Sequence, residues 1–164
     1  MKEYNVGKYA PFSLCIILSV MYFLDLPLNM WTFHFSHANV FHLCGNLIAI
    51  SAILKGTDYR YLPLAFLTSS LEWTMTDGND VGFSAIIYFM WGARIIRDFI
   101  TISAMGERAK MQAYTYAGGI VFVFLLSAIV PNVSFSLHFF PFVSGVVLSG
   151  MIYIWRSFKL DTQV

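Results

Sequence analysis

The lysines and arginines of this chain alternate with long apolar runs in a way that limits how it can fold. Six apolar runs can be drawn, at about residues 11–28, 37–54, 61–75, 84–100, 114–130 and 136–155. All ten basic residues lie before the first run, or near the end of an even-numbered run and in the connector after it: Lys2, Lys8, Lys55, Arg60, Arg94, Arg97, Arg108, Lys110, Arg156 and Lys159. By the positive-inside rule this segregation predicts six membrane spans with both termini in the cytoplasm. A five- or seven-span arrangement would mix the cations across the two sides.

The composition excludes an ordinary soluble domain. Hydrophobic residues make up 58% of the 164 positions and charged residues 12%, far from the usual balance of soluble proteins. Six spans of ~20 residues use most of such a chain, so we expect one all-α, polytopic membrane domain over residues 1–164. The net charge of +1 comes from dispersed cations, which predicts no nucleic-acid partner. Cys15 and Cys44 lie inside apolar runs and are interpreted as buried side chains.

Ser84, at the head of the fourth run, is predicted to lie below the outer membrane surface. Ten residues separate it from Arg94, a helical rise of roughly 15 Å, against a hydrocarbon core of about 30 Å. His42 lies thirteen residues before Lys55, at a similar depth. His138 precedes the cation of the sixth run by eighteen residues, about 27 Å, and should lie nearer the outer face. We therefore expect the serine and the two histidines to share a water-filled pocket open to the outside.

Helical spacing gives the fourth and sixth runs one face each. Ser84, Tyr88 and Gly92 recur every four residues, and therefore lie on one stripe. The sixth run carries a second stripe, mostly of small residues: His138, Pro141, Gly145 and Ser149. Small residues let membrane helices approach closely. If the two stripes pack together, His138 comes within reach of Ser84 as a general base, and Tyr88 supports the imidazole.

The second run supplies candidate donors for an oxyanion. His42 and Asn46 are four residues apart, and so lie on one helical face. An imidazole, a side-chain amide and the backbone N–H of Ser84 are suitable groups to stabilise the negative charge that develops during acyl transfer. Loss of one such donor typically costs about 2.7 to 4 kcal/mol in the transition state.

Other interpretations of the same residues remain open at this point. A serine in a membrane helix usually serves packing or hydrogen bonding, and interhelical hydrogen bonding explains many membrane histidines. The four histidines form a possible zinc site, although none has an acidic neighbour as in H-E-x-x-H. A small transporter or channel would need polar residues along a through path, whereas the candidate polar groups cluster in the outer half.

Three motifs together are similar to those of the rhomboid family of intramembrane serine proteases. Gly82-Phe83-Ser84-Ala85 resembles the family's G-x-S-G, with a tyrosine at the family spacing. His37, His42 and Asn46 follow its second-span pattern of a histidine, a second histidine five residues later and an asparagine four after that. His138 with Gly145 resembles H-x-x-G-x-x-x-G. The departures from the family pattern are Ala85, Pro141 and Trp31-Thr32.

The resemblance implies a serine endopeptidase in a prokaryotic inner membrane, with its site open to the outer side. Its partners would be the lipid bilayer and a transmembrane protein substrate, and it would use no metal or organic cofactor. Ser84 would be the nucleophile, His138 the base, Tyr88 its packing partner, and His42 and Asn46 oxyanion donors. The remaining positions implied to support the site are Gly82, Gly145 and His37, the last within the hydrogen-bonded structure beneath the first outer loop. The alternatives are a catalytically silent relative that binds membrane clients and a rhombosortase that processes carboxyl-terminal sorting tails.

Overall fold

The computed structural model describes residues 6–24, 26–53, 57–76, 80–104, 106–129 and 134–161. These segments contain six α-helices and one short 3-10 helix, and they contain no strand, so the predicted all-α class is confirmed. The elements are α1 (Val6–Tyr22), α2 (Val40–Ile53), the 3-10 helix η1 (Tyr59–Tyr61), α3 (Leu62–Trp73), α4 (Ser84–Ser103), α5 (Glu107–Ile129) and α6 (Ser136–Asp161).

Only α6, among the helices in these segments, is both long and apolar enough to cross a membrane, over Ser136–Trp155. Shorter apolar stretches occur at Tyr9–Tyr22, Val40–Ala52 and Met111–Leu125. The helical fold is therefore established, whereas the six crossings stay a prediction.

Two helix ends differ from the predicted runs, each for a local reason. Helix α1 ends at Tyr22 and not near residue 28, because Pro27 has no N–H and disfavours helical backbone before it. The connector between the predicted runs 84–100 and 114–130 is mostly helical, since α4 continues to Ser103 and α5 begins at Glu107. Gly106, between them, has φ +82°, a left-handed conformation that glycine adopts readily and that separates the two helices.

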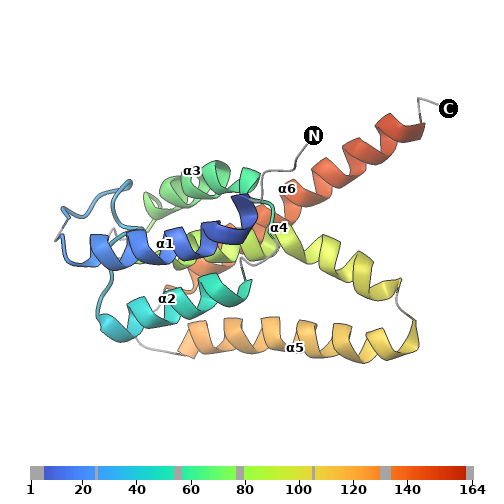
Figure 1. Ribbon diagram of the computed structural model, residues 1–164, viewed down its shortest axis with the longest axis horizontal. Helices are drawn as coiled ribbons and strands as arrows, with labels where there is room; N and C mark the ends of the chain where they lie inside the picture. Colours follow the sequence, from blue (N-terminus) through green and yellow to red (C-terminus); the bar gives the residue numbers. More distant parts are fainter. Residues whose placement is uncertain are drawn as a thin grey trace.

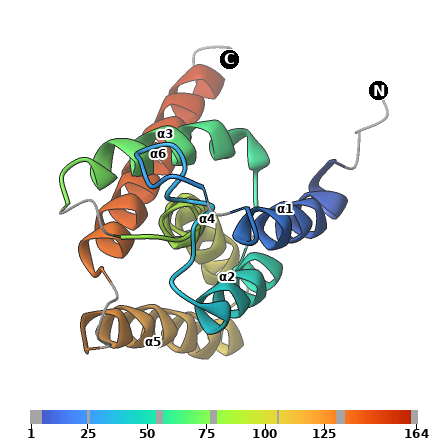
Figure 2. The ribbon, with the colours of Figure 1, turned by 90° about the vertical axis from the view of Figure 1, so that its left-hand side faces the viewer.

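Helix α4 lies at the centre of the bundle. Figure 2 views it nearly end-on, with the other helices around it, and Ile86, Phe89 and Met90 on α4 are all at most 1% exposed. Figure 1 shows that successive helices run in opposite directions: the first residues of α1, α3 and α5 lie toward the right of the view, with the last residues of α2 and α4. Ser84, the first residue of α4, therefore starts the most buried helix of the fold.

Helices α4 and α6 pack against each other with almost no space between their backbones. A Cβ built on Gly92 of α4 would lie 2.1 Å from the carbonyl oxygen of Phe142, and one on Gly145 of α6 would lie 2.1 Å from that of Phe89. No side chain fits at either position. This approach brings the first turn of α6, which carries His138, beside the first turn of α4.

Candidate active site

Ser84 and His138 are in direct contact. Nε2 of His138 lies 3.0 Å from Oγ of Ser84, within the range of a hydrogen bond between a nucleophile and its base. The two residues come from the first turns of α4 and α6, and the glycine contacts between these helices fix their separation. In the tautomer protonated at Nδ1, the imidazole accepts the serine proton at Nε2.

Tyr88 stacks on the histidine, one helical turn after the serine. The ring centroids of Tyr88 and His138 are 4.3 Å apart and their planes differ by 18°. Tyr88 also contacts Phe124 of α5, with the two ring centroids 5.3 Å apart. A stacked ring restricts the rotation of the imidazole, and so helps to hold Nε2 toward Ser84.

Gly82 allows helix α2 to approach the loop that precedes Ser84. Its φ is +123°, which residues with a side chain rarely adopt, and a Cβ there would lie 2.8 Å from Nε2 of His42 and 3.3 Å from Nδ2 of Asn46. Both predicted oxyanion donors therefore lie over the backbone just before Ser84. The first N–H groups of α4 have no acceptor within the helix, so the Ser84 N–H is a third donor at this point.

His37 is hydrogen-bonded to Asn46 and to its own loop. Nδ1 of His37 lies 3.2 Å from the carbonyl oxygen of Phe35, and Nε2 lies 2.9 Å from Nδ2 of Asn46. Because a carbonyl can only accept, Nδ1 carries the proton and Nε2 accepts one hydrogen of the amide. This contact sets which side of the Asn46 amide is nitrogen, and leaves the second N–H hydrogen of the amide for another acceptor.

The loop that precedes Ser84 is hydrogen-bonded to the segment between α1 and α2. The Gly82 N–H donates to the carbonyl oxygen of Phe33 at 2.9 Å, and both Phe33 and the next residue, His34, are fully buried. Nε2 of His34 lies 3.0 Å from Oγ of Ser70 in α3. Burial lowers the pKa of His34 from 6.5 to about 3, so the imidazole stays neutral at physiological pH.

Helix α3 completes this support with polar groups that the motifs did not identify as part of the site. The indole N–H of Trp73 donates to the carbonyl oxygen of Asp80 at 2.9 Å, and Ser144 of α6 donates to Glu72 at 3.1 Å. The only sequence signal for these contacts is the presence of polar residues, such as Ser70 and Glu72, within the third apolar run. In a membrane, neighbouring helices must cover such groups. The pairing of His34 with Ser70 could not be found from spacing, since the two residues are 36 positions apart.

The histidines do not gather around one point. His37 and His42 are close, with ring centroids 5.3 Å apart, but His34 packs 4.5 Å from the ring of Phe66 and His138 contacts the serine. Within the described ranges, no group of three His, Cys, Asp or Glu side chains is placed to hold a metal ion. The residues around Ser84 instead place its hydroxyl beside the imidazole of His138, with the side chains of His42 and Asn46 close to Gly82.

No protein-family model, no curated protein and no solved structure matches this chain.

Proposed function

We propose that this protein is an intramembrane serine protease of the rhomboid type, which hydrolyses peptide bonds in or near transmembrane segments of other proteins. The observation that carries the proposal is the 3.0 Å contact between Nε2 of His138 and Oγ of Ser84. It is joined by the stacked ring of Tyr88 and by the side chains of His42 and Asn46 over Gly82. A half-buried serine that served only packing or hydrogen bonding would need neither the stacked ring nor the side chains of His42 and Asn46.

The proposed reaction uses these groups in two acyl-transfer steps. Oγ of Ser84 attacks the scissile carbonyl carbon while Nε2 of His138 takes the hydroxyl proton. The C–N bond then breaks, and the imidazolium gives its proton to the leaving amine, which leaves an acyl-enzyme. Water attacks the ester, His138 takes a proton from it, and the serine departs with that proton restored. In both steps the oxyanion faces His42, Asn46 and the Ser84 N–H.

The proposal includes six membrane spans with both termini in the cytoplasm. The alternating helix directions in Figure 1 are those of a chain that crosses repeatedly. Large apolar side chains are exposed on the outside of several helices, such as Phe41 at 84%, Phe122 at 60% and Phe140 at 56%. Lipid would cover these side chains without a cost in free energy, whereas in water they would form apolar patches prone to aggregation. Neighbouring helices would shield the polar backbone groups at the ends of short helices such as α3 from lipid.

A serine-reactive fluorophosphonate tests the nucleophile. The wild-type protein, purified in mild detergent, is expected to be labelled at Ser84, while Ser84→Ala and His138→Ala lose labelling. Ser51→Ala is the matched control, because Ser51 is exposed and donates only to the carbonyl of Leu47 in its own helix. Labelling that persists in Ser84→Ala would contradict the proposal, and a folded wild-type protein that takes no label would favour the catalytically silent client-binding alternative.

A further inference from the structure

A second polar cluster lies in the second half of α4, away from the serine. Arg94 is ten residues after Ser84, about 15 Å along the helix. Its Nε donates to Oδ2 of Asp98 at 2.6 Å, and Nε of Arg97 lies 3.9 Å from Oδ1 of the same carboxylate. Asp98 thus holds two arginines at once, although its own side chain is only 15% exposed.

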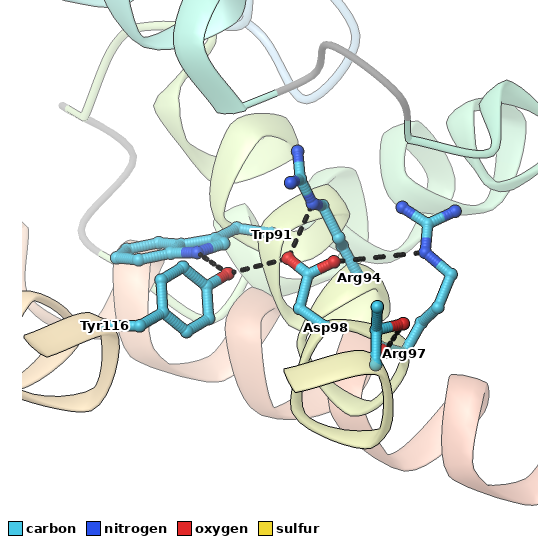
Figure 3. Close-up of polar contacts among 6 residues, drawn as sticks. Trp91, Arg94, Arg97, Asp98 and Tyr116 are labelled. Carbon is cyan, nitrogen blue, oxygen red and sulfur yellow. Dashed lines mark hydrogen bonds and ion pairs between the residues drawn. The ribbon is translucent and has the colours of Figure 1, made fainter. Parts of the chain in front are cut away.

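The carboxylate is held in turn from α5. The hydroxyl of Tyr116 donates to Oδ2 of Asp98 at 3.2 Å, and the indole N–H of Trp91 donates to that hydroxyl at 2.8 Å (Figure 3). Figure 3 also shows that Arg94 and Arg97 meet Asp98 through Nε, while the terminal nitrogens of both guanidinium groups point away from the carboxylate and to the same side. The network therefore orients both guanidinium groups toward the same side.

These two arginines line a cavity. Its volume is about 400 Å³, and its wall includes a third arginine, Arg60, from η1. Among the lining residues the three arginines face one acidic side chain, Asp58, which is paired with Arg60 at 2.6 Å. The three arginines outnumber the two carboxylates, Asp58 and Asp98, so the cluster has a net positive charge. Guanidinium forks match the oxygens of phosphate better than any other side chain does.

The remaining wall combines hydroxyl-bearing residues such as Thr57, Thr101 and Ser149 with an apolar part that suits the acyl chain of an amphiphile. Ile96 and Ile100 of α4 and Ile152 of α6 line the same cavity. On the proposed topology this end of α4 lies at the cytoplasmic leaflet, where anionic lipids concentrate and attract basic residues. A free phosphate ion would use the arginines and leave the isoleucines in water, whereas a phospholipid would contact both.

We propose that this cavity binds an anionic phospholipid, with the headgroup phosphate on Arg94, Arg97 and Arg60 and the upper acyl chain against the isoleucines. The inference goes beyond the proposed protease activity and does not depend on Ser84. A bound lipid would join η1, α4 and α6 on the side of the bundle away from the site.

The test is native mass spectrometry of the full-length, delipidated protein with three probes: phosphatidylglycerol, phosphatidylcholine and inorganic phosphate. We expect phosphatidylglycerol to bind at least about tenfold more tightly than either other probe. The double variant Arg94→Gln/Arg97→Gln should lose about tenfold in that affinity, and Arg94→Lys/Arg97→Lys, which keeps the charge but not the fork, should lose less. Ser84 labelling should be unchanged in all of them.

Arg60→Gln provides a second variant if the double variant does not fold, because its side chain is 77% exposed. It should weaken phosphatidylglycerol binding severalfold while the thermal unfolding midpoint stays within a degree or two. Unchanged phosphatidylglycerol affinity in Arg60→Gln and in every folded glutamine variant would overturn the proposal. Binding of inorganic phosphate as tight as that of phosphatidylglycerol would overturn its assignment to a lipid.

Discussion

At the scale of single residues, the site depends on groups that position other groups. Nδ1 of His37 is tied to the Phe35 carbonyl, so its Nε2 must accept from Asn46. Asn46 is 5% exposed, and an amide in that position has few alternative partners. His37 therefore acts on the proposed oxyanion through Asn46, as a positioning residue.

Removing the imidazole of His37 should impair catalysis only while Asn46 is present. His37→Ala is expected to lower kcat on the order of tenfold with little change in KM, because the amide is free to rotate. Asn46→Ala should lose on the order of a hundredfold, as for other oxyanion donors. In the double variant, His37→Ala should add almost nothing to the loss. Full additivity of the two kcat effects would show that His37 acts elsewhere.

His34 makes the stability of the fold depend on pH. Its pKa is about 3 in the folded protein, where burial opposes the charge, and 6.5 when the side chain is in water. Between these values the unfolded chain binds a proton that the folded chain excludes, so falling pH favours unfolding. His34 should contribute a loss of at most about 1.4 kcal/mol per pH unit below 6.5, and none above it.

The measurement is the unfolding midpoint of detergent-solubilised protein at pH 7.5, 6 and 5. His34→Gln is the comparison, since glutamine does not titrate and its amide can still bond to a hydroxyl. The wild type should lose more stability than the variant as the pH falls. Parallel pH profiles for the two proteins would mean that His34 is not the group responsible.

At the scale of helices, the α4–α6 contact determines whether the dyad exists. The sequence motifs identified both helices, their order and the stripes that face each other. This was possible because residues three or four positions apart in the sequence lie on the same face of a helix. They could not reveal that Phe33, between two helices, accepts the Gly82 N–H, or that α3 supports that segment through Ser70. Such contacts join residues with no common periodicity, so only the folded chain brings them together.

Gly145→Ala should force α4 and α6 apart. The new Cβ would lie 2.1 Å from the backbone carbonyl of Phe89, and backbone cannot rotate away as a side chain can. We expect a loss of at least about 1 to 3 kcal/mol in unfolding free energy, with loss of Ser84 labelling. Gly118→Ala in α5 is the matched control, since nothing lies within 4 Å of its Cβ position. Alanine there should be neutral or stabilising by about 0.5 to 1 kcal/mol.

Equal stability of the two alanine variants, with labelling retained in both, would contradict the close packing. The comparison separates the α4–α6 contact from the general effect of replacing glycine in a helix, because both positions lie inside helices.

At the scale of the whole molecule, the cation pattern predicted six membrane spans. The described segments contain six α-helices, and successive helices run in opposite directions, while their crossing of a membrane stays a prediction. What the pattern could not predict was how unequal the helices are: α3 has 12 residues and α6 has 26. A span length inferred from hydropathy assumes that every helix crosses the full hydrocarbon core, whereas a helix packed against others can be shorter than that thickness.

The proposed topology predicts which loops a membrane-impermeant maleimide can reach in intact cells. In a protein with Cys15→Ala and Cys44→Ala, Ala38→Cys should be labelled from outside, and Ala104→Cys only after permeabilisation. Both alanines are exposed, so burial does not explain a difference. Labelling of both positions in intact cells, or the reverse pattern, would refute the six-span orientation.

The central claim is most directly tested by cleavage of a single-span protein in proteoliposomes that contain the purified protein. The wild type should cut the substrate within or beside its membrane segment, and Ser84→Ala and His138→Ala should each abolish the cut while both variants keep the wild-type unfolding midpoint. Cleavage that continues at the wild-type rate in either variant would contradict the account.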